Sequence, residues 1–379
     1  MKNLNILFLF VLIYSTSFAQ TKQINVHFEV FSSNISDSSN IYIVGSNSTL
    51  GNWNPGEVKL NKLGNGKYFI NLLFNQNQQI EYKFTKGNWQ LQALNENGTI
   101  PGNYNLTVKN DTSIIHNINN WAKRTPPPAF KEQITGTVNY HRQMPYDGLQ
   151  PRDVFVWLPY NYELDKNKHY PVLYMHDGQN IFNPQTASFG YDWQIDETAD
   201  SLIKQGKIPP FIIVGINNTP DRMLEYTNSD LGYKYMKYIV EDLKPFIDST
   251  YRTLKNRDNC YTGGSSAGGL ISFMLLWEYN NIFSKALCFS PAFKIEELDY
   301  VTTVYNTKEK KDIKVYIANG GKNLEERLQP GITEMINLLE EKGYQKNKDF
   351  WFNKFEEDDH SEKSWAKRIP QYFLLMFGK

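Results

Sequence analysis

A serine between glycines, Ser266, is the residue whose setting most directly suggests chemistry. It lies in the sequence GSSAG at residues 264–268, after the short apolar run NCYTG and before the longer run GLISFMLLWEY. This G-x-S-x-G pattern is typical of a tight turn from a strand into a helix, which projects the serine hydroxyl above a sheet. The pattern predicts a nucleophilic serine. The alternative is a glycine-rich turn that only packs a helix on a strand.

A histidine must take the proton of such a serine, because a hydroxyl is a weak nucleophile without a neighbouring base. Where the nucleophile lies on such a strand-to-helix turn, the chain order is serine, then acid, then histidine. The chain has 6 histidines: His27, His116, His141, His169, His176 and His360. Only His360 follows Ser266, so we expect His360 to be the base. It lies in KFEEDDHSEKSW, between an apolar-aromatic run and the last predicted helix; an exposed acidic loop is the alternative.

The acid that orients the histidine is expected after the apolar run IKVYIAN, in the sequence GGKNLEE at residues 320–326. A carboxylate stabilises the imidazolium as it forms, whereas an amide can only orient the ring. Glu325 is therefore the preferred acid, with Glu326 and Asn323 as rivals. The alternative is a helix start with two exposed glutamates.

Catalysis by such a serine also needs two backbone amides that donate to the developing oxyanion. One is expected from Ala267, directly after the nucleophile. The other is expected from Gln179, in the sequence HDGQN after the apolar run YPVLYM. We interpret His176 and Asp177 as residues that shape this loop, since no second histidine-rich cluster completes a metal site.

The elements that carry these residues alternate between apolar runs and helical patterns from residue 134 to 379. The runs include DVFVWLP, YPVLYMHDG, PFIIVGI and KALCFSP. Continuous apolar strands between helices indicate a mostly parallel sheet covered on both faces. Such sheets carry their chemistry at the carboxyl ends of the strands. The prediction is an α/β-hydrolase domain over residues 134–379.

The region before this domain has a different pattern of polar and apolar residues. Residues 20–120 alternate polar and apolar side chains in short runs separated by Asn, Gly, Ser and Pro. This pattern predicts a small antiparallel, immunoglobulin-like β-sandwich. Residues 121–133 contain KRTPPPA and predict a stiff proline-rich linker.

The net charge and the N-terminal segment indicate which binding partners and which cellular location to expect. Lys plus Arg and Asp plus Glu both total 40, so no net field favours nucleic acid or anionic lipid. Residues 1–19 combine an early lysine, an apolar core and a small-x-small ending, which predicts a signal peptide and a secreted or periplasmic protein without a membrane span. Cys260 and Cys288 lie in apolar runs, and we expect reduced core thiols rather than a disulfide.

The region from about residue 135 to 379 resembles the esterase family that includes esterase D, feruloyl esterases and enterochelin esterases. The matching segments are MHDGQNIF, YDWQIDE, VGI followed by RMLEYT, GGSSAGG and HSEKSW. The resemblance implies that Ser266 and His360 are nucleophile and base. Members of the family carry Asp or Glu near the position of Asn323.

The first domain resembles a starch-binding carbohydrate-binding module. The matching segments are IYIVGSNSTLGNW, EYKFTKGNW and NENG. The resemblance implies that Trp53 and Trp89 stack on a sugar ring and that Lys83 donates a hydrogen bond to it. The alternative is a sandwich whose tryptophans only pack.

These inferences together predict a secreted serine esterase that needs no metal or organic cofactor. Its expected partners are an ester substrate, carbohydrate-linked or sugar-like, and a glucan or other carbohydrate at the first domain. The same residues would also suit acyl transfer to a sugar hydroxyl or cleavage of a siderophore ester. A different class of hypothesis is a carbohydrate-binding protein whose hydrolase domain is degraded.

Overall fold

The computed structural model describes residues 22–122 and 134–378, apart from residues 34, 36–38, 52, 89–90 and 99–100. The chain divides into two compact units, Met1–Lys123 and Arg124–Lys379, and each is described by itself. The predicted signal peptide and residues 123–133 of the predicted linker lie outside the described residues.

The first unit is a β-sandwich, as its alternating pattern predicts. One sheet has the strand order β4-β5-β1-β9 and the other β3-β2-β6-β8, while β7 and β10 form a separate pair. The strands are β1 (Gln23–Phe31), β2 (Tyr42–Gly45), β3 (Val58–Lys59), β4 (Asn61–Gly64), β5 (Lys67–Asn75), β6 (Gln79–Thr85), β7 (Ala93–Leu94), β8 (Tyr104–Thr107), β9 (Thr112–Asn117) and β10 (Asn120–Trp121). Alternate side chains of β1, such as Val26 and Phe28, are buried between the sheets.

Two features of this unit differ from a purely antiparallel sandwich that ends at residue 120. Strands β1 and β9 pair in parallel, with Val26 opposite Thr112. Trp121, where the linker was expected to begin, pairs with Ala93 in β7. Its indole Nε1 donates to Ser32 Oγ at 2.9 Å and its side chain is buried.

The second unit is built on one eight-stranded sheet with the order β11-β12-β14-β13-β15-β16-β19-β20. Strand β12 pairs antiparallel with β11 on one side and with β14 on the other, and the remaining strands of the sheet, in the order β14-β13-β15-β16-β19-β20, are mutually parallel. These strands are β11 (Thr137–Tyr146), β12 (Leu149–Leu158), β13 (Val172–His176), β14 (Ile212–Ile216), β15 (Cys260–Ser265), β16 (Lys285–Phe289), β19 (Lys314–Gly320) and β20 (Phe350–Phe355); β17 (Lys294–Ile295) and β18 (Leu298–Asp299) form a small separate pair. The mostly parallel sheet is the predicted one.

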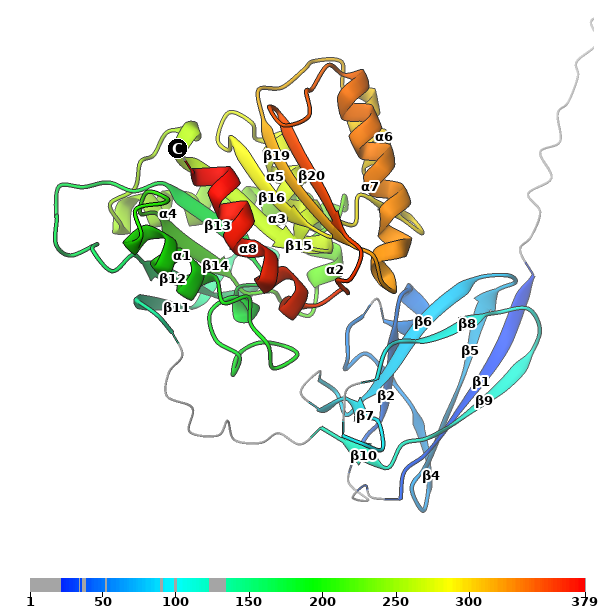
Figure 1. Ribbon diagram of the computed structural model, residues 1–379. Helices are drawn as coiled ribbons and strands as arrows, with labels where there is room; N and C mark the ends of the chain where they lie inside the picture. The colour runs from blue at the N-terminus through cyan, green and yellow to red at the C-terminus, as the bar shows by residue number, and fades with distance from the viewer. Residues whose placement is uncertain are drawn as a thin grey trace, which may run out of the picture. The chain divides into compact units, whose positions relative to one another are not determined.

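Helices cover both faces of this sheet (Figure 1). Helices α1 and α8 pack against one face of the sheet, and helices α3 to α7 contribute to the hydrophobic core on the other face. The helical segments are α1 (Ile195–Lys204), α2 (Arg222–Glu225), α3 (Asp230–Lys237), α4 (Lys244–Thr250), α5 (Ala267–Glu278), α6 (Val301–Asn306), α7 (Leu324–Glu341) and α8 (Glu362–Phe377), with a π-helical turn at Tyr238–Leu243 between α3 and α4. Helix α5 is buried on every side, because its sequence is apolar all round.

Four neighbouring parallel strands, β15, β16, β19 and β20, position the candidate site. Because their carboxyl ends meet at one edge of the sheet, the loops that follow them lie close together. These loops and the helix starts that follow them carry Ser266, Ser290, Glu325 and His360 in that order.

Cys260 and Cys288 are free and buried, which confirms the prediction of core thiols. Among the described residues, no helix has both the length and the apolar character needed to cross a bilayer.

Candidate active site

Ser266 occupies the sharp turn between β15 and α5. Its backbone has φ 57° and ψ −126°, a conformation that is costly for a residue with a side chain and is found mainly at functional turns. A Cβ atom on Gly264 would lie 2.7 Å from the carbonyl oxygen of Gly268. The turn therefore requires glycine at that position, which is the physical reason for the sequence pattern.

The acid beside His360 is Glu325, not Glu326 or Asn323. His360 Nδ1 donates to Glu325 Oε1 at 3.0 Å, and the Glu325 side chain is fully buried. Glu326 and Asn323 are exposed. A hydrogen bond to a carboxylate requires the proton on Nδ1, which leaves Nε2 of His360 to accept a proton from a serine hydroxyl.

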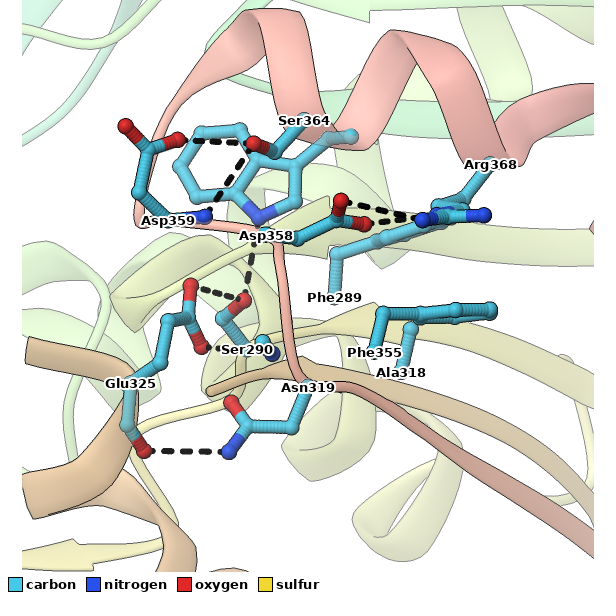
Figure 2. Close-up of a pocket in the computed structure, with 12 residues that line it drawn as sticks. Phe289, Ser290, Ala318, Asn319, Glu325, Phe355, Asp358, Asp359, Ser364 and Arg368 are labelled. Atoms are coloured by element: carbon cyan, nitrogen blue, oxygen red, sulfur yellow. Dashed lines mark hydrogen bonds and ion pairs between the residues drawn. The ribbon is translucent and has the colours of Figure 1, made fainter. Parts of the chain in front are cut away.

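Two further donors hold the Glu325 carboxylate in place (Figure 2). Ser290 Oγ donates to Oε1 at 2.7 Å, and the Gly320 amide donates to Oε2 at 3.1 Å. The Ser290 hydroxyl also accepts from the indole Nε1 of Trp365 at 3.0 Å. Sequence reasoning missed Ser290 and Trp365, since they lie 35 and 40 residues from Glu325 in the chain and carry no local motif.

The link from Ser266 to this network runs through the backbone. The Ser266 amide donates to the Phe289 carbonyl at 2.9 Å, directly before Ser290. Within the described part of the chain, no hydrogen bond joins the Ser266 hydroxyl to His360. Hydrogen bonds of this kind are often long without substrate and shorten when it binds.

An ion pair and several hydrogen bonds hold the loop that carries His360. Asp358 forms a two-pronged ion pair with Arg368 of α8, at 2.6 and 2.9 Å, and is buried. Asp359 accepts hydrogen bonds from Ser361 and Ser364 at the start of α8. The loop is thus not merely an exposed acidic stretch. A cavity of about 10 Å³, room for roughly one water molecule, is lined by Glu325, Ser290, Asp358, Asp359 and Arg368 (Figure 2).

The candidate oxyanion donors lie after two adjacent strands. Ala267 is the first residue of α5, so its amide has no carbonyl partner within the helix. Gln179 lies in a single 3₁₀ turn, η3 (Gly178–Asn180), directly after β13. Strands β13 and β15 pair in parallel, which brings both loops to the same edge of the sheet.

The η3 loop is fixed by an ion pair whose carboxylate, Asp177, is buried and whose Arg222 is partly exposed. Arg222 donates to both oxygens of Asp177, at 2.8 and 2.7 Å. A Cβ atom on Gly268 would lie 3.1 Å from Asp177 Oδ2, so this pair packs against the start of α5. Burial lowers the pKa of His176 to about 3, which suits a neutral residue that shapes the loop rather than a general base.

Helix α2, which carries Arg222, is held by a second ion pair, and this one is fully buried. Arg152 donates to both oxygens of Glu225, at 2.9 and 2.5 Å, and both side chains are inaccessible to solvent. Breaking such a pair by removing one partner typically costs about 3–5 kcal/mol. Because Arg152 lies on β12 and Glu225 on α2, this pair attaches α2 to the sheet and thereby holds Arg222 in contact with Asp177.

The candidate sugar-binding residues lie in the first unit. Trp53 is half-buried, and its amide donates to the Gly45 carbonyl at the end of β2 at 2.7 Å. The preceding residue of β2, Val44, pairs with Lys83 on β6. The backbones of Trp53 and Lys83 are therefore close. Burial lowers the pKa of Lys83 to about 8. Trp89 lies outside the described residues.

Two known protein families match this chain, one over each of its two units. The model of a family described as "Putative esterase" matches residues 149–376, which is more than half of the 379 residues. The chain belongs to that esterase family. Residues 23–116 match the family model described as "Starch binding domain". Both resemblances inferred from the sequence motifs are confirmed.

Individual relatives match only parts of the chain. YbbA of Bacillus subtilis is 27% identical over 143 residues, which cover 34% of this chain and 52% of YbbA. An endo-1,4-beta-xylanase/feruloyl esterase of Xylanibacter ruminicola is 31% identical over 121 residues, 30% of this chain and 16% of that protein. The chain thus spans about half or less of the length of these relatives.

A solved structure of a ferulic acid esterase shares the fold of the esterase domain. It aligns with a TM-score of 0.54 at 20% identity, covering 64% of this chain and 98% of that one.

The esterase domain holds one more buried acid near its site, Glu362. It is the first residue of α8 and accepts from Asn180 Nδ2 in the η3 loop at 3.1 Å. Burial raises the pKa of Glu362 to about 7. Sequence reasoning missed this contact, which joins residues 182 positions apart.

The raised pKa of Glu362 predicts that the unfolding free energy of the domain depends on pH. A carboxyl group whose pKa is higher in the folded state stabilises the fold below its unfolded pKa, and this contribution is lost as the pH rises through the folded value. We expect the unfolding free energy of the wild type, relative to Glu362→Gln, to fall by about 3 kcal/mol between pH 4.5 and pH 8.

Urea unfolding of the esterase domain at these two pH values measures the difference. The variant Glu326→Gln, on an exposed carboxylate, serves as the control and should show almost no pH-dependent difference from the wild type. A difference between wild type and Glu362→Gln that is equal at both pH values would contradict the prediction.

Proposed function

We propose that this protein is a serine esterase that hydrolyses a carboxylic ester borne on a carbohydrate. The observation that carries the proposal is the hydrogen bond from His360 Nδ1 to the buried Glu325, next to the turn that presents Ser266. Membership of the esterase family supports the same conclusion.

In the proposed mechanism, Ser266 Oγ attacks the ester carbonyl carbon while His360 Nε2 takes its proton. Glu325 stabilises the imidazolium that forms. The amides of Ala267 and Gln179 donate to the oxyanion. The bond to the alcohol then breaks, and His360 returns the proton to the leaving alkoxide. Water then attacks the acyl carbon while His360 takes its proton, the bond to Ser266 Oγ breaks, and His360 returns the proton to Oγ as the carboxylic acid leaves.

The carbohydrate part of the proposal rests on the starch-binding domain. An indole offers a flat apolar face and an N–H donor, which suits the C–H face of a sugar ring. Trp53 and Lys83 would provide the platform and a hydrogen-bond donor. A binding domain tethered to an enzyme raises the effective concentration of a polymeric substrate. A signal peptide at residues 1–19 would direct the protein out of the cytoplasm.

One comparison tests the function and the role of the first domain together. We expect the wild type to hydrolyse both acetylated starch and p-nitrophenyl acetate and to be retarded on amylose. Trp53→Ala should lose the retardation and turn over acetylated starch about tenfold more slowly, while its rate with p-nitrophenyl acetate stays unchanged. The control is Leu73→Ala, which removes an exposed apolar side chain from β5 and should behave as the wild type.

Hydrolysis of neither acetyl nor feruloyl esters by the wild type would contradict the esterase assignment. Unretarded migration of the wild type on every glucan tested would leave the first domain a structural module. Release of free acid with and without added maltose distinguishes hydrolysis from transfer of the acyl group to a sugar hydroxyl.

A further inference from the structure

Three carboxylates meet at the N-terminal end of α1, away from the residues assigned to catalysis. Asp192, Asp196 and Glu197 each offer one oxygen, and these oxygens all lie within 4.8 Å of one another. Asp192 and Asp196 are buried, while Glu197 is partly exposed.

This cluster has unsatisfied oxygens. Asp196 Oδ1 and Glu197 Oε2 are shielded from solvent and accept from no N–H or hydroxyl donor of the described chain, so without a cation the two carboxyl groups would have to share a proton. The other oxygen of Asp196, Oδ2, accepts from the Thr135 amide at 2.7 Å, which fixes the orientation of the carboxylate. Asp196 is fully buried, and buried charged groups are normally paired with an opposite charge or coordinate a metal.

No positive charge of the described chain balances the cluster. Among the described residues, no Lys, Arg or His forms an ion pair with any of the three carboxylates. The cluster therefore lacks a positive partner from that part of the protein.

The spacing of the oxygens fits a calcium ion. Calcium binds oxygen ligands at about 2.3–2.6 Å, so two ligands of one ion lie at most about 5 Å apart. Carboxylates that bind through one or both oxygens are its usual ligands, and water completes the shell. The exposed side of Glu197 leaves access for such water molecules. We propose that Asp192, Asp196 and Glu197 form a structural calcium site.

The site would fix a segment that packs behind the active site. Trp193 lies between two of the ligands, and its amide donates to the Asn180 carbonyl at 3.0 Å. Its ring centroid is 5.5 Å from that of Trp365, whose ring in turn lies edge-on to His360 at 5.0 Å. Bound calcium would therefore stabilise the loop before α1 together with Trp193. The catalytic steps themselves do not involve the ion.

Calorimetric titration and thermal unfolding of the full chain, first stripped with EDTA and desalted, test the proposal with calcium chloride as the probe. We expect measurable calcium binding and a rise in the unfolding temperature of about 5–10 °C at a free concentration near a hundred times Kd. Asp192→Asn should lose both effects. Asp200→Asn should keep them, because Asp200 is a buried carboxylate on the same helix that pairs with Lys204 outside the cluster.

The unfolding temperature of Asp192→Asn in EDTA checks that the variant folds; it should equal or exceed that of the wild type in EDTA, because one repulsive charge is gone. Absence of calcium binding by the wild type would overturn the proposal, and a proton shared by Asp196 and Glu197 would then account for the cluster. Calcium binding by Asp192→Asn with wild-type affinity would overturn it as well.

Discussion

Replacing Ser266 by alanine is expected to lower kcat for p-nitrophenyl acetate by about 10⁴-fold or more. The methyl side chain of alanine cannot attack the carbonyl carbon, so the acyl-enzyme does not form. The oxyanion donors and the binding site remain, and they leave a residual rate above that in water. Initial rates at saturating substrate give the comparison.

Ser265 provides the matched control, because it lies one residue earlier and is buried at the end of β15. Ser265→Ala should retain most of the wild-type kcat. A Ser266→Ala variant that turns over the ester at the wild-type rate would remove the serine from the mechanism.

Replacing Glu325 by glutamine is expected to lower kcat by about 10²–10⁴-fold. The amide is nearly the same size, but it cannot stabilise the imidazolium. It can also turn its N–H group toward His360, which favours the tautomer with the proton on the wrong nitrogen. In that orientation the amide oxygen would accept from the Gly320 amide, while Ser290 Oγ would face the amide nitrogen in place of its present acceptor.

Two neighbours separate this effect from a general change of charge. Glu326→Gln and Asn323→Ala alter the exposed rivals in the same turn and should leave kcat close to that of the wild type. Full activity in Glu325→Gln, with a large loss in either neighbour, would reassign the acid. Thermal unfolding of each variant shows whether a lost rate reflects lost folding.

The sequence alone locates Ser266 and His360 because each has a signal that does not depend on tertiary contacts. For Ser266 the signal is glycine spacing between an apolar strand and an apolar helix. For His360 it is chain order, since no other histidine follows the serine.

The acid is not determined in this way, because Asn323, Glu325 and Glu326 lie within one turn. Helix α7 begins at Leu324, and this starting point places Glu325 on the buried side of the helix and Glu326 on the exposed side.

The contacts that hold the site together could not be predicted. Ser290 to Glu325 and Asn180 to Glu362 join segments that are far apart in the chain, and single polar residues in loops give no pairing signal. The hairpin strand β11 was also missed, since its residues are mostly polar and half-exposed. In the first domain the alternation of side chains predicts strands and their buried faces, but it does not distinguish the parallel pair β1–β9 from an antiparallel one.

The central claim is that Ser266 is an activated nucleophile, and reaction with a fluorophosphonate probe tests it most directly. Intact-mass and peptide analysis of the wild type should show one adduct per chain, on Ser266, and Ser266→Ala should show none. Wild-type protein that stays unlabelled under conditions that label a known serine hydrolase, or a Ser266→Ala variant that is labelled as readily as the wild type, would contradict the claim.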